Sequence, residues 1–212
     1  MPDDFDLELP NLGDDRPGLD ELEDADELVV GGDDDDEDDD YPDDATEDDV
    51  DLIVALYRED GQPMVVALDL DLVNDLDALI TQLRRIPGDG GALAMVSIAT
   101  EMFVIVRVRG RHVQVLLSDV VEAADWPLAR DVVDYLGLEV PDDDEDSYPV
   151  GDLDLLADVG LPDFELEAIA SAYDEDTTTL LEQVAKRIKF GPQYTKAVAA
   201  AFECCGTVPG SP

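Results

Sequence analysis

The chain has 212 residues, of which 56 are Asp or Glu and 12 are Lys or Arg, so its formal net charge at pH 7 is −44. Binding to nucleic-acid phosphates or to anionic membrane surfaces needs clustered Lys and Arg, so this balance argues against both as direct partners. It favours a partner protein with a basic surface.

Export and membrane insertion are not indicated by the sequence. There is no run of about 18 apolar residues that would predict a transmembrane helix. The opening MPDDFDLELP lacks the basic region and apolar core of a secretion signal. The two cysteines, Cys204 and Cys205, are adjacent, so they form no disulfide framework and make a poor zinc site. We therefore expect a cytoplasmic protein without a metal.

Residues 1–49 are predicted to form a disordered acidic tail. They hold 25 of the acidic residues and a single Arg, so mutual repulsion opposes compaction and little apolar area is available for burial. Leucines and valines are scattered among the acids. The tail is therefore interpreted as a solubilising segment, with docking on a partner as the alternative.

Order is expected to begin near Val50. Residues 51–70 contain two β-rich runs around Asp60-Gly61, which predicts a hairpin. Both faces of the first run are apolar, which indicates a strand covered on both sides. Residues 72–86 carry apolar side chains at helical spacing and end before Pro87, and residues 93–99 predict a third strand.

Residues 102–118, MFVIVRVRGRHVQVLLS, predict a central hairpin with Gly110-Arg111 at its tip. This turn places Arg109 opposite His112 and the valines of the two strands opposite each other. One face of the hairpin is then apolar and must be buried, so a slip by one residue would put arginines in the core. The side chains that share the apolar face are Val104, Val106, Val108, Val113, Val115 and Leu117.

The other face of this hairpin carries Arg107, Arg109, Arg111 and His112, which we take as the candidate contact for an anion or a partner. Two interpretations stay open: the arginines bind an anion, including the acidic run of their own tail, or they form a solvated strand face. A lone His titrates near neutral pH, but without a recognisable Ser or Cys partner an exposed tip residue is expected. The three cations at 186–189 are interpreted as a solvated helix face.

Pro127 and Gly137 bracket a second helix, which gives the order β-β-α-β-β-β-α. We predict an α+β domain over residues 50–140, with an antiparallel sheet and one helical layer. Longin-like and roadblock-like domains have the same order. Residues 141–152 are predicted to be an acidic linker or loop, residues 153–205 a helical region, and residues 206–212 a frayed end.

Known catalytic and cofactor motifs do not occur in the sequence. GxGxxG, the P-loop, the nucleophile elbow and the HxE…PCxxC pattern of zinc deaminases are all missing. No catalytic, cofactor-binding or metal-binding residue is therefore predicted.

The segments VLLSDVVEAADWPLARDVVDYLGL, DLDLLADVGL and KRIKFGPQY resemble the bacterial tRNA adenosine deaminase-associated proteins over about residues 50–205. The resemblance implies association with the deaminase that makes inosine at the wobble position of tRNA. It implies no catalytic residue, and the acidic extension has no counterpart in it.

Two functions are therefore considered. The first is a non-enzymatic accessory protein that binds a basic protein surface, with tRNA adenosine deaminase as the candidate partner and the acidic tail as a mimic of the RNA backbone. The second is an enzyme or small-ligand module in residues 50–140, which requires a deep pocket lined by polar groups near His112 and the arginines. Acidity as an adaptation to salt is a third interpretation. The sequence leaves the oligomeric state open.

Overall fold

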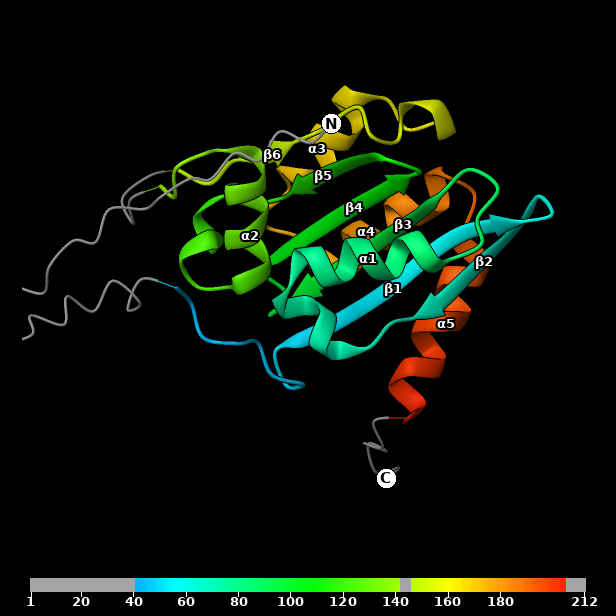
Figure 1. The fold of residues 1–212 in the computed structure, drawn as a ribbon, viewed down its shortest axis with the longest axis horizontal. Helices are drawn as coiled ribbons and strands as arrows, with labels where there is room; N and C mark the ends of the chain where they lie inside the picture. Colours follow the sequence, from blue (N-terminus) through cyan, green and yellow to red (C-terminus); the bar gives the residue numbers. More distant parts are fainter. Residues whose placement is uncertain (1–40, 142–145, 205–212) are drawn as a thin grey trace, which may run out of the picture. The chain divides into compact units, whose positions relative to one another are not determined.

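A computed structural model describes residues 41–141 and 146–204, with side chains as far as residue 200. It confirms an α+β fold built on one antiparallel sheet in the order β2-β1-β3-β4-β5-β6 (Figure 1). The strands are β1 (Val50–Glu59), β2 (Gln62–Ala67), β3 (Ala92–Ile98), β4 (Met102–Arg109), β5 (His112–Leu117) and β6 (Val150–Gly151). The α-helices are α1 (Leu76–Arg85), α2 (Pro127–Leu136), α3 (Asp163–Ala170), α4 (Thr177–Arg187) and α5 (Gly191–Cys204).

The two predicted hairpins form where their glycines place them. Asp60 and Gly61 both have positive φ angles, 51° and 75°, and join β1 to β2 as a two-residue turn. At the central hairpin Gly110 has a φ of 61°, and Arg109 pairs with His112. The rest of that ladder follows the predicted register, so the apolar face of β4 and β5 is fixed by local sequence alone.

Helices α1 and α2 cover one face of the sheet. Their buried leucines and valines join a core with the inward side chains of the central hairpin, among them Val104, Val106, Val115 and Leu117. Asp75 caps α1 by accepting a hydrogen bond from the N–H of Ala78 at 2.8 Å, and Gly137 ends α2 with a φ of 69°.

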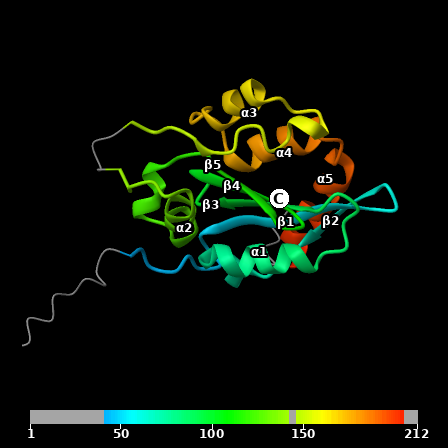
Figure 2. The ribbon, with the colours of Figure 1, turned by 45° about the horizontal axis from the view of Figure 1, so that its top comes forward.

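Within residues 50–140 the helices form one layer, as predicted, and the C-terminal helical region, which the sequence did not place, adds a second layer. Helices α3, α4 and α5 pack on the other face of the sheet, so the sheet lies between two helical layers (Figure 2). The physical reason is that the outward side chains of β1, β4 and β5 are also apolar. Leu52, Val54, Leu56, Phe103, Ile105 and Leu116 form a second buried core with these helices. The predicted two-sided burial of β1 is therefore correct, and it holds for its neighbours as well.

The segment predicted as an acidic linker contributes an edge strand. Within residues 141–152, β6 pairs with β5, with Val150 opposite Leu117 and Gly151 opposite Leu116. Gly151 has a φ of 110°, and a Cβ at this position would lie 2.2 Å from the carbonyl oxygen of Val115. Only glycine therefore allows the chain to approach β5 so closely.

Packed structure begins earlier than Val50. Of the predicted tail, residues 1–40 lie outside the described residues, whereas residues 41–49 contact the folded body. The Tyr41 hydroxyl donates to Asp131 at 2.8 Å, and the N–H of Ala45 donates to Asn74 at 2.8 Å. The predicted boundary at Val50 is thus too late, because this acidic stretch is held by specific side-chain partners. The predicted frayed end, residues 206–212, also lies outside the described residues.

No helix among the described residues is both long and apolar enough to cross a bilayer.

Candidate functional site

The predicted arginine cluster is largely engaged by the chain's own carboxylates. Arg107 on β4 is only 8% exposed, and its guanidinium donates to both carboxylate oxygens of Asp158 and to the carbonyl oxygen of Leu155. The hydrogen bond from Arg107 is the main cause that lowers the pKa of the Asp158 carboxyl. The anion that Arg107 binds is therefore an internal one, 51 residues further along the chain.

Arg109 belongs to the same network. It donates to Asp158 at 3.2 Å and to the Gln114 side chain at 3.2 Å, and Gln114 in turn donates to Asp154 at 3.3 Å. These contacts attach the 3-10 helix Ala157–Val159 and the turn before it to the strands of the central hairpin. The structure thus brings Arg107 and Arg109 together on one carboxylate.

Arg111 and His112 lie apart from this network. Both are exposed at the tip of the hairpin, as expected for a turn. Contact of these two residues with a partner or an anion stays a prediction.

A second candidate site lies where the N-terminus of α1 meets α2, and sequence reasoning did not find it. It is a groove of about 440 Å³ that contains four carboxylates and two tyrosines and, among its described lining residues, no cation. The groove is lined by Tyr41, Asp75, Leu76, Asp77, Asp131, Asp134 and Tyr135. We call it the acidic groove.

Two of the four carboxylates in the acidic groove accept hydrogen bonds that stabilise the fold. Asp131 accepts from the Tyr41 hydroxyl and, through its other oxygen, from the N–H of Leu76 at 2.9 Å. Asp75 caps α1. Burial, followed by the hydrogen bond to Asp131 and the charges around it, raises the pKa of Tyr41, so this hydroxyl stays protonated and keeps its hydrogen bond.

The remaining groups of the acidic groove are open to solvent. Asp77 and Asp134 are exposed, and the Tyr41 and Tyr135 side chains are each 49% exposed. Asp134 lies 3.8 Å from Arg130, one helical turn away. Exposed tyrosines are enriched in protein interfaces, and the carboxylates give this one a negative potential. Nothing in the local sequence pattern identified the groove, because its residues come from three separate segments.

Within the part of the chain that the structure describes, no group of three or more His, Cys, Asp or Glu residues is arranged to hold a metal ion.

The fold and the groove define an acidic, antiparallel α+β protein with two helical layers. The sequence profile of the Rv3753c-like tRNA adenosine deaminase-associated proteins matches residues 51–191, and the chain belongs to that family. The matched range takes in β1 from its second residue, the other five strands, and helices α1 to α4. The family description names association with the deaminase and not deaminase activity itself.

One relative is Protein Rv3753c of Mycobacterium tuberculosis strain H37Rv. It is 33% identical to this chain over 148 residues, which cover 68% of this chain and 86% of that protein. No solved structure matches the chain.

Proposed function

We propose that this protein is a non-catalytic accessory factor that binds a basic protein surface in the cytoplasm, and that tRNA adenosine deaminase is the partner. The family description supplies the candidate partner. The observation that carries the proposal is the acidic groove, where four carboxylates and two exposed tyrosines line one surface and no cation is among the described lining residues.

The charge distribution supports a basic partner. Of the eleven Lys and Arg residues within 41–141 and 146–200, five form ion pairs inside the chain: Arg107, Arg109, Arg130, Lys186 and Arg187. The 56 acidic residues of the sequence are therefore mostly left uncompensated. A protein that binds tRNA must present cations to the phosphates, so its binding surface is complementary to such a field.

The acidic groove is suited to specificity as well as attraction. Charge accelerates encounter but discriminates weakly between basic surfaces, whereas aromatic side chains in a shaped groove fix one orientation. Tyr41 is held by Asp131, and Tyr135 projects from the rigid α2 helix. In this proposal the acidic residues 1–40 add a polyanion that competes with tRNA for the same partner.

The test is binding of the full chain to purified tRNA adenosine deaminase from the same organism, measured by calorimetry at several salt concentrations. Asp77→Asn with Asp134→Asn removes two exposed charges of the groove that make no capping contact. We expect about tenfold weaker binding and a shallower dependence on salt, since two charge contacts of ordinary strength are lost.

The matched control carries Asp163→Asn and Glu167→Gln on α3, which lies on the opposite helical layer. Both residues are exposed, and Asp163, like Asp77, stands in the first turn of its helix. The control should bind as the unmodified chain does. Equal loss in both variants, or no binding by the unmodified chain, would refute the groove as the contact.

A further inference from the structure

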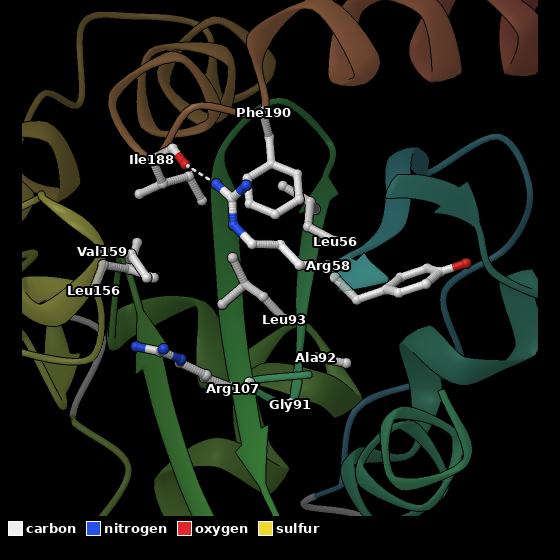
Figure 3. Close-up of a pocket in the computed structure, with 12 residues that line it drawn as sticks. Leu56, Arg58, Gly91, Ala92, Leu93, Arg107, Leu156, Val159, Ile188 and Phe190 are labelled. Carbon is white, nitrogen blue, oxygen red and sulfur yellow. Dashed lines mark hydrogen bonds between the residues drawn. The ribbon is translucent and has the colours of Figure 1, made fainter. Parts of the chain in front are cut away.

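A separate pocket lies on the other face of the sheet, between the ends of β1 and β3 and the turn that joins α4 to α5 (Figure 3). Its floor is apolar, and an arginine stands at either end. The residues that line it are Leu56, Tyr57, Arg58, Gly90, Gly91, Ala92, Leu93, Arg107, Leu156, Val159, Ile188 and Phe190. The small-ligand alternative required a pocket near His112, and this one includes Arg107 but not His112.

Arg58 is held in place at the mouth of the pocket. Its guanidinium carbon lies 4.7 Å from the centre of the Phe190 ring, and one nitrogen donates to the carbonyl oxygen of Ile188 at 3.2 Å. Figure 3 shows the guanidinium beside the ring, with Leu93 between it and Arg107. The guanidinium is thus oriented, and it has five N–H donors of which Ile188 uses one.

The lack of a carboxylate partner sets Arg58 apart. Within residues 41–141 and 146–200, it is the only Lys or Arg that is not exposed and that has no described carboxylate within 4.0 Å. Arg107, at the other end of the pocket, is neutralised by Asp158. The chain has nearly five acidic residues for each basic one, so a half-buried guanidinium with no described carboxylate partner is unusual here. This guanidinium is available to form charge-assisted hydrogen bonds with a bound anion.

The size of the pocket limits what can bind. Its volume of about 80 Å³ corresponds to roughly five to eight water-sized groups at 10–15 Å³ each. A planar carboxylate matches the fork of a guanidinium, and leucine, isoleucine and valine side chains provide an apolar surface for the rest of the ligand.

We propose that this pocket binds a small organic monoanion, whose carboxylate pairs with Arg58 and whose apolar body lies on Leu93 and Val159. The site is distinct from the acidic groove, which lies against the opposite face of the sheet. The proposed ligand site can therefore be tested independently of the proposed partner protein.

Benzoate and isovalerate are suitable probes, added to the full chain and followed by ¹H–¹⁵N correlation spectra. A dissociation constant on the order of 1 mM is expected for ligands with so few atoms. Shifts should be concentrated at the amides of residues 90–93 and 188–190. Benzamide, which has the same ring without the charge, should bind at least tenfold more weakly.

Arg58→Lys retains the cation beside Phe190 but loses the fork, and should weaken benzoate binding at least fivefold. Arg58→Met should weaken it further. Arg111→Met removes the same charge from the exposed hairpin tip and should leave binding unchanged. Thermal melting confirms that each variant is folded. If benzoate and isovalerate cause no shifts at these amides, or if Arg111→Met weakens binding as much as Arg58→Met, the proposal is wrong.

Discussion

Asp158 accepts hydrogen bonds from both terminal nitrogens of the Arg107 guanidinium. A half-exposed carboxylate therefore neutralises a cation that is almost fully buried on the sheet. Of the two side chains, Arg107 is 9% exposed and Asp158 is 51% exposed. This pair joins the central hairpin to the segment that leads into the second helical layer. It is a structural contact in a place where the sequence suggested a docking site.

Asp158→Asn should destabilise the protein by about 1–2 kcal/mol, because Arg107 keeps its charge but loses its anion, while the exposure of Asp158 screens the interaction. Since the pKa of Asp158 is lowered in the folded state, its contribution is present above the pKa of the unfolded chain and is lost as pH falls through the folded value. Urea unfolding at pH 7 and at pH 3 measures both effects.

Asp154→Asn is the control for this measurement, since the Asp154 carboxylate accepts a single hydrogen bond from the described residues, a 3.3 Å contact with Gln114. It should change stability by less than about 0.5 kcal/mol. Equal destabilisation by the two variants would show that general charge, and not the Arg107 pair, is responsible.

Glu122→Gln should remove a pH dependence of stability near neutrality. Burial, reinforced by the charges of Glu101, Asp119 and Asp125, raises the pKa of Glu122 to about 7. A carboxyl with a raised pKa stabilises the fold fully below its unfolded pKa, and this stability is lost as pH rises through 7. Gln keeps an oxygen for the Trp126 indole N–H, which lies 3.1 Å from Glu122.

At pH 8 the Glu122→Gln variant should be about 1 kcal/mol more stable than the unmodified chain, after allowance for solvent screening of a partly exposed group. At pH 5 the two should be nearly equal. Thermal unfolding at both values measures the difference, with Glu167→Gln on α3 as a control for removal of one exposed charge. A gain of the same size at pH 5 would contradict the assignment.

Phe103→Ala tests whether the second helical layer folds together with the sheet. Phe103 is fully buried against that layer, so its truncation should cost about 3–5 kcal/mol. Phe164→Ala is the control, because Phe164 is 65% exposed. The single tryptophan, Trp126, packs with the first core, on the other face of the sheet.

If both layers fold as one unit, Phe103→Ala lowers the guanidinium midpoint of the Trp126 fluorescence transition by the amount that corresponds to its whole loss of stability. If the division into a sheet domain of residues 50–140 and a helical region of residues 153–205 also separates two folding units, that transition stays in place. Guanidinium unfolding followed by fluorescence and by circular dichroism distinguishes the two results.

The local features of this fold were predictable from the sequence. Asp60-Gly61 and Gly110-Arg111 fix two hairpins because a turn of two residues sets the register of its own strands. Helices α1 and α2 were marked by apolar spacing and by Pro127 and Gly137. In each case the determining residues lie within a few positions of the element that they specify.

The two sites depend on contacts between distant segments. Arg107 meets Asp158 across 51 residues, Tyr41 meets Asp131 across 90, and Arg58 meets Ile188 across 130. Periodicity shows that a face is apolar, but it does not show which helices will cover it. The sequence thus determined strands, turns and register through local backbone preferences. Only tertiary packing decided that Arg107 is buried with an internal anion, that Arg58 has no carboxylate partner among the described residues, and that four carboxylates share one groove.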